Sequence, residues 1–247
     1  YHGALKLAMD KIGYDALLKE QIEKREKGEL MGIGISSFTE VVGAGPSKDF
    51  DILGIKMFDS SEIRIHPTGN VIARFGTKSH GQGHETTYAQ MIAEELGIPH
   101  SDVTVEEGDT DTAPYGVGTD ASRSTPTAGA AAAVACRKSK DKAQKIAAHL
   151  LEAAEEDLEW EVGKFSVEGV ADKERKKEDI TFDVYTNNPH GLEAGQVENH
   201  IYDPPTMTYP FGSYISVADL YKGTVAVKLS RYVAVDTRGK SVKTMSG

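Results

Sequence analysis

The chain has little of what marks a secreted, membrane-spanning or nucleic-acid-binding protein. Its single cysteine, Cys136, excludes an internal disulfide and permits a reducing compartment. No apolar run approaches the length of about 20 residues that a transmembrane helix needs. Basic residues are also scarce, with 28 Lys and Arg against 38 Asp and Glu and a formal net charge of -10. This balance argues against nucleic acid and against an anionic membrane surface, because both require a basic face.

Two further absences concern processing and catalysis. The sequence opens at Tyr1 without a methionine or a signal peptide, which suggests a segment of a longer polypeptide. The G-x-S-x-G motif that would support a Ser/His/Asp hydrolase is missing. With 247 residues, 39% of them hydrophobic, the chain can still bury a sizeable core as one large or two small domains.

A glycine-rich stretch, H-G-Q-G-H at 80–84, joins a predicted strand to a predicted helix that ends near Leu96. Gly81 and Gly83 let the backbone turn tightly and approach a ligand without a Cβ in the way. The first turn of the helix adds unpaired N–H groups, which together suit an anion. Gln82 between the glycines offers two donors and an acceptor. Taken alone, such a stretch is more often only a tight turn.

A second glycine-rich stretch, T-A-P-Y-G-V-G-T-D-A-S-R-S-T-P at 112–126, shares this design. We expect Pro126 at the first helical position, with Ser124 or Thr125 as the cap. The hydroxyl groups around Arg123 and its guanidinium are suited to holding phosphate. Two loops of one design favour a shared binding site over two unrelated turns.

These stretches also carry a family resemblance. G-Q-G-H-E-T-T-Y-A-Q, E-E-G-D-T-D-T-A-P-Y-G-V-G-T and S-R-S-T-P-T-A-G-A-A resemble the molybdenum-binding large subunits of the carbon monoxide dehydrogenase type, in the xanthine oxidase family of molybdenum hydroxylases. G-I-G-I-S-S-F-T-E-V-V-G-A-G-P-S and Y-D-P-P-T-M-T-Y-P-F-G extend the resemblance from about Tyr1 to Val235.

The resemblance implies a fold, a cofactor and partners. The fold class is α+β, with mixed sheets packed with helices, as in molybdopterin-binding domains of the xanthine oxidase and aldehyde oxidase type. The cofactor is molybdopterin, in its cytosine dinucleotide form. Small iron-sulfur and medium flavin subunits would take the electrons from a small-molecule substrate, carbon monoxide being oxidised with water to carbon dioxide. The location implied is cytoplasmic, with a peripheral place at the inner face of the membrane left open.

The resemblance also implies which residues would contact the cofactor: Gly81, Gln82, Gly83, His84, Thr119, Ala121, Ser122, Arg123, Ser124 and Thr125.

Three departures from the family pattern limit what this segment supplies. The family's copper-bearing cysteine loop would precede Tyr1, and Cys136 cannot replace it. The glutamate base of a G-x-G-E motif would follow the C-terminus, and the motif does not occur here. Asp120-Ala121 stands where the family has Tyr-Gly, and residues 237–247 drift from the pattern D-C-G-x-x-I-N-P. We therefore assign no catalytic or metal-ligating residue, and we expect copper, 2Fe-2S clusters and FAD only on absent segments or partner subunits.

Two alternatives stay open at this point. Asp120 and the divergent C-terminus favour a non-catalytic module that keeps the fold without the cofactor, whereas the intact glycine-rich stretches favour the enzyme. A hydroxylase of the same family that acts on an aldehyde or an N-heterocycle is also compatible with the sequence. In either enzymatic case, we expect the isolated 247-residue chain to be inactive.

Metal sites other than the cofactor are disfavoured. His80 and His84 have zinc-like spacing only on a helix, and two glycines lie between them. The acidic run at 106–111 lacks the glycine placement of a calcium loop and is interpreted as a solvated turn. We expect Cys136 to be a buried small hydrophobe in an alanine-rich helix.

Hydrophobic periodicity predicts most of the elements. The expected domains are a cofactor-binding lobe at 1–167, an exposed connection at 168–197 and a strand-rich part of a second lobe at 198–247. The expected elements are helices before and after Gly13, a strand at 31–42, a hairpin around 67–70, a helix to Leu96, a long helix from Pro126 to about Ala154, a short hairpin around Gly163, and two strands at 211–220 and 224–235.

Overall fold

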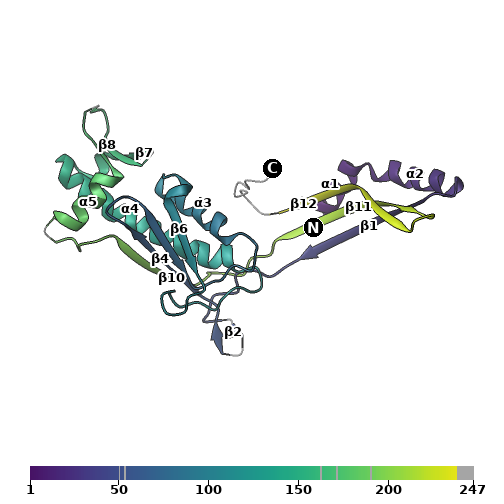
Figure 1. The fold of residues 1–247 in the computed structure, drawn as a ribbon, viewed down its shortest axis with the longest axis horizontal. Helices are drawn as coiled ribbons and strands as arrows, with labels where there is room; N and C mark the ends of the chain where they lie inside the picture. The colour runs from purple at the N-terminus through teal and green to yellow at the C-terminus, as the bar shows by residue number, and fades with distance from the viewer. Residues whose placement is uncertain (50, 53, 162, 171, 190, 238–247) are drawn as a thin grey trace. The chain divides into compact units, whose positions relative to one another are not determined.

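A computed structural model describes residues 1–49, 51–52, 54–161, 163–170, 172–189 and 191–237 of the chain. These residues form two compact units, one built from residues 1–42 and 208–237, the other from residues 43–207 (Figure 1). Helices and sheets occur in both units, and the predicted α+β class is confirmed. None of the described helices has both the length and the apolar character needed to cross a membrane.

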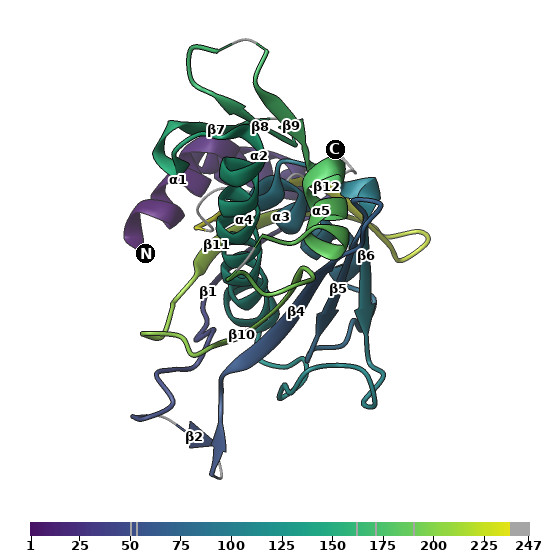
Figure 2. The same ribbon diagram turned by 90° about the vertical axis from the view of Figure 1, so that its left-hand side faces the viewer.

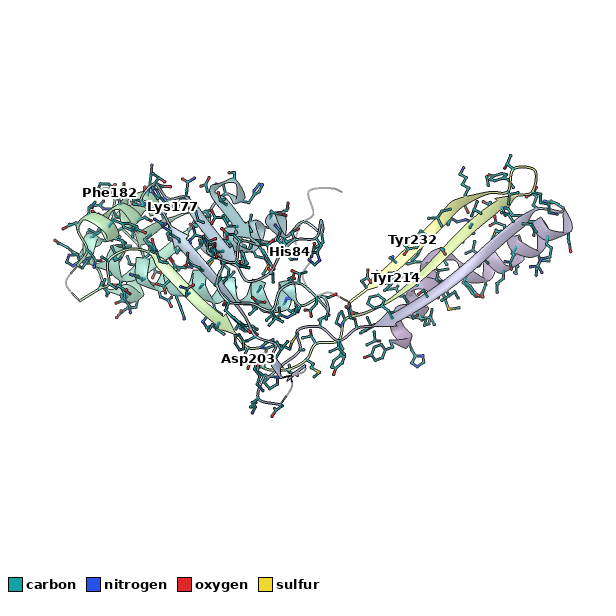
Figure 3. All side chains as sticks on the ribbon, turned by 60° about the horizontal axis from the view of Figure 1, so that its bottom comes forward. His84, Lys177, Phe182, Asp203, Tyr214 and Tyr232 are labelled. Carbon is teal, nitrogen blue, oxygen red and sulfur yellow. The ribbon has the colours of Figure 1, made fainter. Side chains whose placement is uncertain are left out.

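The first unit is a three-stranded antiparallel sheet with two helices. Its elements are α1 (His2–Ile12), α2 (Tyr14–Glu26), β1 (Leu30–Thr39), β11 (Phe211–Tyr221) and β12 (Ala226–Asp236), with strand order β1-β11-β12. Gly13 adopts φ 70°, which ends α1 and begins α2 as the glycine at this position predicted. Leu17 of α2 packs on Met31 and Val217 of the sheet. On β11 and β12, the rings of Tyr214 and Tyr232 stack at 6.1 Å (Figure 3).

The second unit is centred on a mixed four-stranded sheet of order β10-β4-β5-β6. Its strands are β4 (Asp59–Ile65), β5 (Val71–Phe75), β6 (Val103–Glu107) and β10 (Val197–Tyr202). The pairs β10/β4 and β4/β5 are antiparallel, whereas β5 and β6 are parallel. Alternating residues of the strands and the apolar faces of α3 (His84–Leu96) and α4 (Ala130–Leu151) form the main core. Figure 2 shows where these two helices and the strands of the sheet lie.

Three smaller groups of elements complete this unit. A two-stranded ribbon consists of β2 (Asp51–Ile52) and β3 (Ile55–Lys56). A three-stranded sheet consists of β7 (Leu158–Glu161), β8 (Lys164–Val167) and β9 (Glu174–Lys176), followed by α5 (Lys177–Thr186). Short helical turns lie at η1 (His100–Asp102), η2 (Ser124–Gly129) and η3 (Glu155–Asp157).

The structure divides the chain differently from the expected 1–167, 168–197 and 198–247. The expected connection contains β9 and α5, and Ile180 and Val184 of α5 are buried against Phe165. β10 pairs with β4 in the second unit, whereas β11 and β12 pair with β1 in the first. The charged run at 173–179 includes the first turn of α5, so the sequence there did not indicate a helix with a narrow apolar side. The division into units follows the long-range strand pairing. Of the divergent stretch at 237–247, all residues after Thr237 lie outside the described part of the chain.

Small side chains let α4 pack closely. Ala131, Ala132, Ala135 and Cys136 have almost no exposed surface. At Gly129, just before α4, a Cβ would lie 2.7 Å from Met91 Cε of α3. The residues at the start of the long helix thus determine how near α3 it can lie.

Cys136 is expected to react slowly with iodoacetamide in the folded chain and much faster after unfolding. Its side chain is buried, and burial raises the pKa of its thiol to about 12. Since the thiolate is the nucleophile, both its accessibility and its concentration are low in the folded state. Mass spectrometry of the alkylated protein at pH 8, with and without urea, measures the two rates. Equal rates would contradict the buried position.

Candidate cofactor site

The two glycine-rich loops meet because they follow neighbouring parallel strands. Phe75 is the last residue of β5 and pairs with Glu107, the last residue of β6. The first loop begins at Gly76 and leads into α3, and the second begins at Gly108 and leads into η2 and α4. Ligands of open α/β sheets commonly bind beyond the carboxyl ends of parallel strands, where successive loops converge.

Direct contacts tie the loops together. The backbone N–H of Lys78 donates to Thr119 Oγ1 at 2.9 Å. A Cβ built on Gly116 would lie 2.5 Å from the Cα of Gly76 and 2.5 Å from Asp59 Oδ1. No side chain larger than hydrogen fits between these two backbones. The convergence of the loops is therefore established at their bases. The shared binding site at their tips, with Gln82 beside residues 122–125, stays a prediction.

The tips of the loops have the backbone that the sequence predicted. Gly81, Gly83 and Gly118 have φ values of 100°, 79° and 88°, in the left-handed region that favours glycine. A Cβ on any of them would meet nothing within 4 Å. Open space over these glycines is what a close-lying ligand requires.

Both helix starts lack a side-chain cap. Gly83 is the N-cap of α3 and Arg123 that of η2, and neither makes a side-chain capping bond. The N–H groups of a first turn have no intrahelical acceptor. Each start therefore offers N–H donors and about half a positive charge to an anion.

The second helix begins differently from the prediction. A turn of π-helix, η2, starts at Ser124, so that Pro126 is the third residue and not the first. Its missing N–H costs no hydrogen bond there, because the whole first turn lacks intrahelical acceptors. Single π turns are frequently found at functional sites.

Arg123 is placed inside the protein, which corrects its interpretation as a phosphate ligand through the guanidinium. Its side chain is fully buried, and Nη1 donates to Asp59 Oδ2 at 2.6 Å and to the Gly118 carbonyl at 2.9 Å. Nη2 donates to the carbonyls of Met57 and Phe58, both at 2.9 Å. The guanidinium thus holds the second loop to the start of β4.

The charge partner of Arg123, Asp59, has no exposed surface. Burial raises the pKa of its carboxyl, against the opposing effects of Arg123 and of the N–H groups of Ser60 and Val117. Asp120 is half exposed, with Oδ1 at 3.9 Å from Arg123 Nε. Its carboxylate is therefore next to a cation, which lessens the conflict with an anionic cofactor that its sequence position suggested.

The other predicted contacts of the second loop divide between surface and interior. Ala121 and Ser122 are exposed and have positive φ values of 42° and 54°, and Thr125 is also exposed. The Ser124 side chain is buried and hydrogen-bonds to the Tyr88 hydroxyl. Ser122 and Thr125 thus remain the hydroxyls suited to phosphate, whereas Ser124 faces the core.

In the first loop, Gly81 and Gln82 are exposed, whereas His84, which is labelled in Figure 3, is buried. Gln82 Oε1 accepts from the His80 N–H at 2.5 Å, and Gln82 Nε2 is 3.0 Å from His84 Nε2. His84 Nδ1 is 2.9 Å from Oε1 of Glu107, whose side chain is only 2% exposed. The sequence reading missed Glu107, because the run at 106–111 was interpreted as a solvated turn. Both Glu106 and Glu107 belong to β6, which corrects that interpretation.

The residues present fit a bound pterin with anionic groups at the loop tips. The observations that favour it are the open space over the three glycines and the two uncapped helix starts. A neighbouring groove of about 550 Å³ carries Glu85, Glu106, Glu107 and Asp109 against Arg74 and Lys78. This acidic groove is a poor place for phosphate, and the loop tips are the better one.

Comparisons with known proteins agree with this geometry. The carbon monoxide dehydrogenase large chain of Afipia carboxidovorans is 57% identical over 251 residues, covering 99% of this chain and 31% of the relative. Reconstituted CO dehydrogenase from Oligotropha carboxidovorans matches with a TM-score of 0.85 and 58% identity, over 96% of this chain and 30% of that one. Quinoline 2-oxidoreductase from Pseudomonas putida 86 matches with a TM-score of 0.78 and 32% identity, over the same shares.

The chain thus spans about 30% of the length of these relatives. The family profile described as a molybdopterin cofactor-binding domain matches residues 7–246. The chain is similar to one part of carbon monoxide dehydrogenase large chains, and it belongs to the molybdopterin cofactor-binding domain family.

Proposed function

We propose that this chain forms part of the molybdopterin site of an enzyme that oxidises carbon monoxide with water to carbon dioxide. The observation that carries the proposal is the meeting of the two glycine-rich loops, with the Lys78 N–H bonded to Thr119 Oγ1. Each loop leads into an uncapped helix start, and the glycines leave room for a ligand. The bound cofactor supplies two-electron oxidation with water as the oxygen source, and this chain supplies binding and orientation.

The exposed residues at the loop tips are the proposed contacts. The N–H groups after Gly83 and around Ser124 bind anionic oxygens of the cofactor, and the Gln82 carboxamide orients the pterin. The Ser122 and Thr125 hydroxyls add donors for phosphate. Two helix starts suit the two phosphates of a dinucleotide form, which supports the cytosine dinucleotide. Acid hydrolysis of the purified enzyme should then release CMP.

Partners and location belong to the same proposal. We propose that iron-sulfur and flavin subunits accept the electrons, since the similar relatives include the large chain of carbon monoxide dehydrogenase. A cytoplasmic location, and the inactivity of the isolated chain, stay predictions. Assaying the purified chain with carbon monoxide and an artificial acceptor tests the second, and turnover would contradict it.

A second candidate is a hydroxylase of N-heterocycles. It is favoured by the match to quinoline 2-oxidoreductase, whose identity to this chain is 32%. The identity of 57% to a carbon monoxide dehydrogenase large chain favours the first candidate. Assays of the complete enzyme with carbon monoxide and with quinoline separate the two.

Gln82→Ala in the complete enzyme is expected to speed the loss of molybdenum on dialysis by about tenfold, which corresponds to about 1.4 kcal/mol of lost hydrogen bonding. The fold should be unchanged, because the Gln82 side chain is exposed. Molybdenum per large subunit, measured by mass spectrometry during dialysis, gives the rate. Glu85→Gln is the control: it alters another exposed side chain, in the first turn of α3, and removes a negative charge beside the proposed anion site, so it should not speed the loss. An unchanged rate in Gln82→Ala would show that Gln82 is only a turn residue.

A further inference from the structure

We propose that Glu107 and His84 are positioning residues, which fix the orientation of the Gln82 carboxamide at the cofactor site. This inference rests on the proposed cofactor-binding function and adds two residues of a buried network to it. The side chains of Glu107 and His84 are 2% and 6% exposed, so neither can contact a ligand broadly. Their effect on a ligand acts through Gln82, which is exposed at the tip of the first loop.

The hydrogen bonds around Glu107 determine which ring nitrogen of His84 carries a proton. Oε2 accepts from the backbone N–H of Ser79 at 3.0 Å. Oε1 accepts from Thr77 Oγ1 at 2.7 Å and lies 2.9 Å from His84 Nδ1. A carboxylate only accepts, so His84 Nδ1 must carry the hydrogen and donate it. In the neutral ring, His84 Nε2 is then an acceptor.

That acceptor fixes the Gln82 carboxamide. Gln82 Nε2 donates to His84 Nε2 across 3.0 Å, while Gln82 Oε1 accepts from the His80 N–H across 2.5 Å. Rotating the amide by 180° would place Nε2 against the His80 N–H and Oε1 against a ring nitrogen without a hydrogen. Both bonds would be lost. The carboxamide therefore has one orientation, with one amide hydrogen and one oxygen lone pair left for a ligand.

Glu107→Gln reverses the polarity of this network with almost no change in shape. Ser79 N–H still requires an oxygen, so the new NH₂ group would occupy the Oε1 position and donate toward His84 Nδ1. His84 would then carry its hydrogen on Nε2 and point it at the Gln82 NH₂ group, donor against donor. Turning the new amide over instead would place its NH₂ group against the Ser79 N–H. In both arrangements, one bond of the network that orients the Gln82 carboxamide in the parent protein is lost.

The test measures the rate of molybdenum loss from the complete enzyme, with thermal unfolding recorded for each variant. Glu107→Gln is expected to lose molybdenum about tenfold faster than the parent, as variants of residues that orient a ligand often do. Glu106→Gln is the matched control. It removes the same charge one residue earlier, from the opposite face of β6, where Glu106 Oε2 accepts from Arg74 Nε at 2.7 Å. Its rate should stay within about twofold of the parent's.

Combining substitutions separates positioning from a general loss of stability. If Glu107 acts through Gln82, Gln82→Ala with Glu107→Gln should lose molybdenum no faster than Gln82→Ala alone. His84→Asn is the second variant, in case Glu107→Gln fails to fold. Its side-chain amide lies at the distance of Nδ1, so that it still bonds to Glu107 but cannot reach Gln82.

Each outcome decides the inference. Parent-like rates in Glu107→Gln and His84→Asn, with Gln82→Ala accelerated, overturn the positioning role and leave the proposed function standing. Multiplied effects in the double variant also overturn it, because the two residues then act independently. A parent-like rate in Gln82→Ala overturns the role of Gln82 itself and the inference with it.

Discussion

Asp59→Ala is expected to lower the free energy of unfolding of the second unit by about 3–5 kcal/mol, the usual cost of leaving one partner of a buried ion pair uncompensated. Asp59 and Arg123 have no exposed surface, and their 2.6 Å contact is the only hydrogen bond that the guanidinium donates to a carboxylate in the described residues. Without Asp59, the buried guanidinium would keep only three backbone carbonyls and the half-exposed carboxylate of Asp120, 3.9 Å from Nε. Urea unfolding followed by the fluorescence of Trp160, the single tryptophan and a residue of the same unit, measures the change.

Asp120→Ala is the matched control for Asp59→Ala. Asp120 is the other carboxylate near Arg123, but it is half exposed and its oxygen is 3.9 Å from Nε. Its removal should change the free energy of unfolding by at most about 0.5 kcal/mol. If the two substitutions lowered the free energy of unfolding equally, burial of the Asp59–Arg123 pair would add nothing to its contribution to stability. The complete Asp59→Ala enzyme should also lose molybdenum faster on dialysis. Asp59 pairs with Arg123, and Arg123 holds the second loop through the Gly118 carbonyl.

Gly116→Ala is expected to cost about 3 kcal/mol, at the upper end of the usual range for overpacking. The new Cβ would lie 2.5 Å from the Gly76 Cα and 2.5 Å from Asp59 Oδ1, and neither a backbone nor a buried ion pair can move cheaply. Gly76→Ala should have a similar effect, because its Cβ would lie 2.5 Å from the Gly116 Cα. The same urea unfolding experiment measures both.

Gly118→Ala separates steric overlap from backbone strain. Gly118 has φ 88° but nothing within 4 Å of a Cβ, so its substitution carries only the strain of a left-handed residue, about 1–2 kcal/mol. If Gly116→Ala lowered the free energy of unfolding no more than Gly118→Ala does, the close approach of the two loops would be contradicted. The contrast also tests the structure at the site itself, because both glycines lie in the second loop.

Local patterns in the sequence predicted the parts of the site that are local. Gly81 and Gly83 required a left-handed backbone before a helix, and the structure has both. The hairpin around Trp160 and Phe165 was also predicted, and the two residues pair directly across β7 and β8. In such cases, the deciding interactions lie within about ten residues.

The parts that were missed depend on residues far apart in the chain. Nothing near Arg123 indicates that its partner is Asp59, 64 residues earlier. Glu107 looked like one of several solvated acids, and only the pairing of β5 with β6 shows that its side chain is buried beside His84. The predicted domain boundary was wrong for the same reason. The charged residues of α5 suggested an exposed connection, and only the folded structure shows that one side of this helix is buried. A charged residue next to a strand end is therefore weak evidence for solvent exposure.

The pairing of β1 with β11 has a consequence for biosynthesis. These strands pair from Leu30 with Leu220 to Thr39 with Phe211, so the first unit is built from two distant parts of the chain. At 5–20 residues per second, roughly 10–30 s separate their emergence from the ribosome. The segment from Gly43 to Met207 is continuous and can fold during this interval. The apolar surface of α1, α2 and β1 that packs on β11 and β12 stays exposed until those strands are synthesised. On arrested nascent chains, we expect this continuous segment to become protease-resistant first and the N-terminal helices to be bound by chaperones until β11 is synthesised.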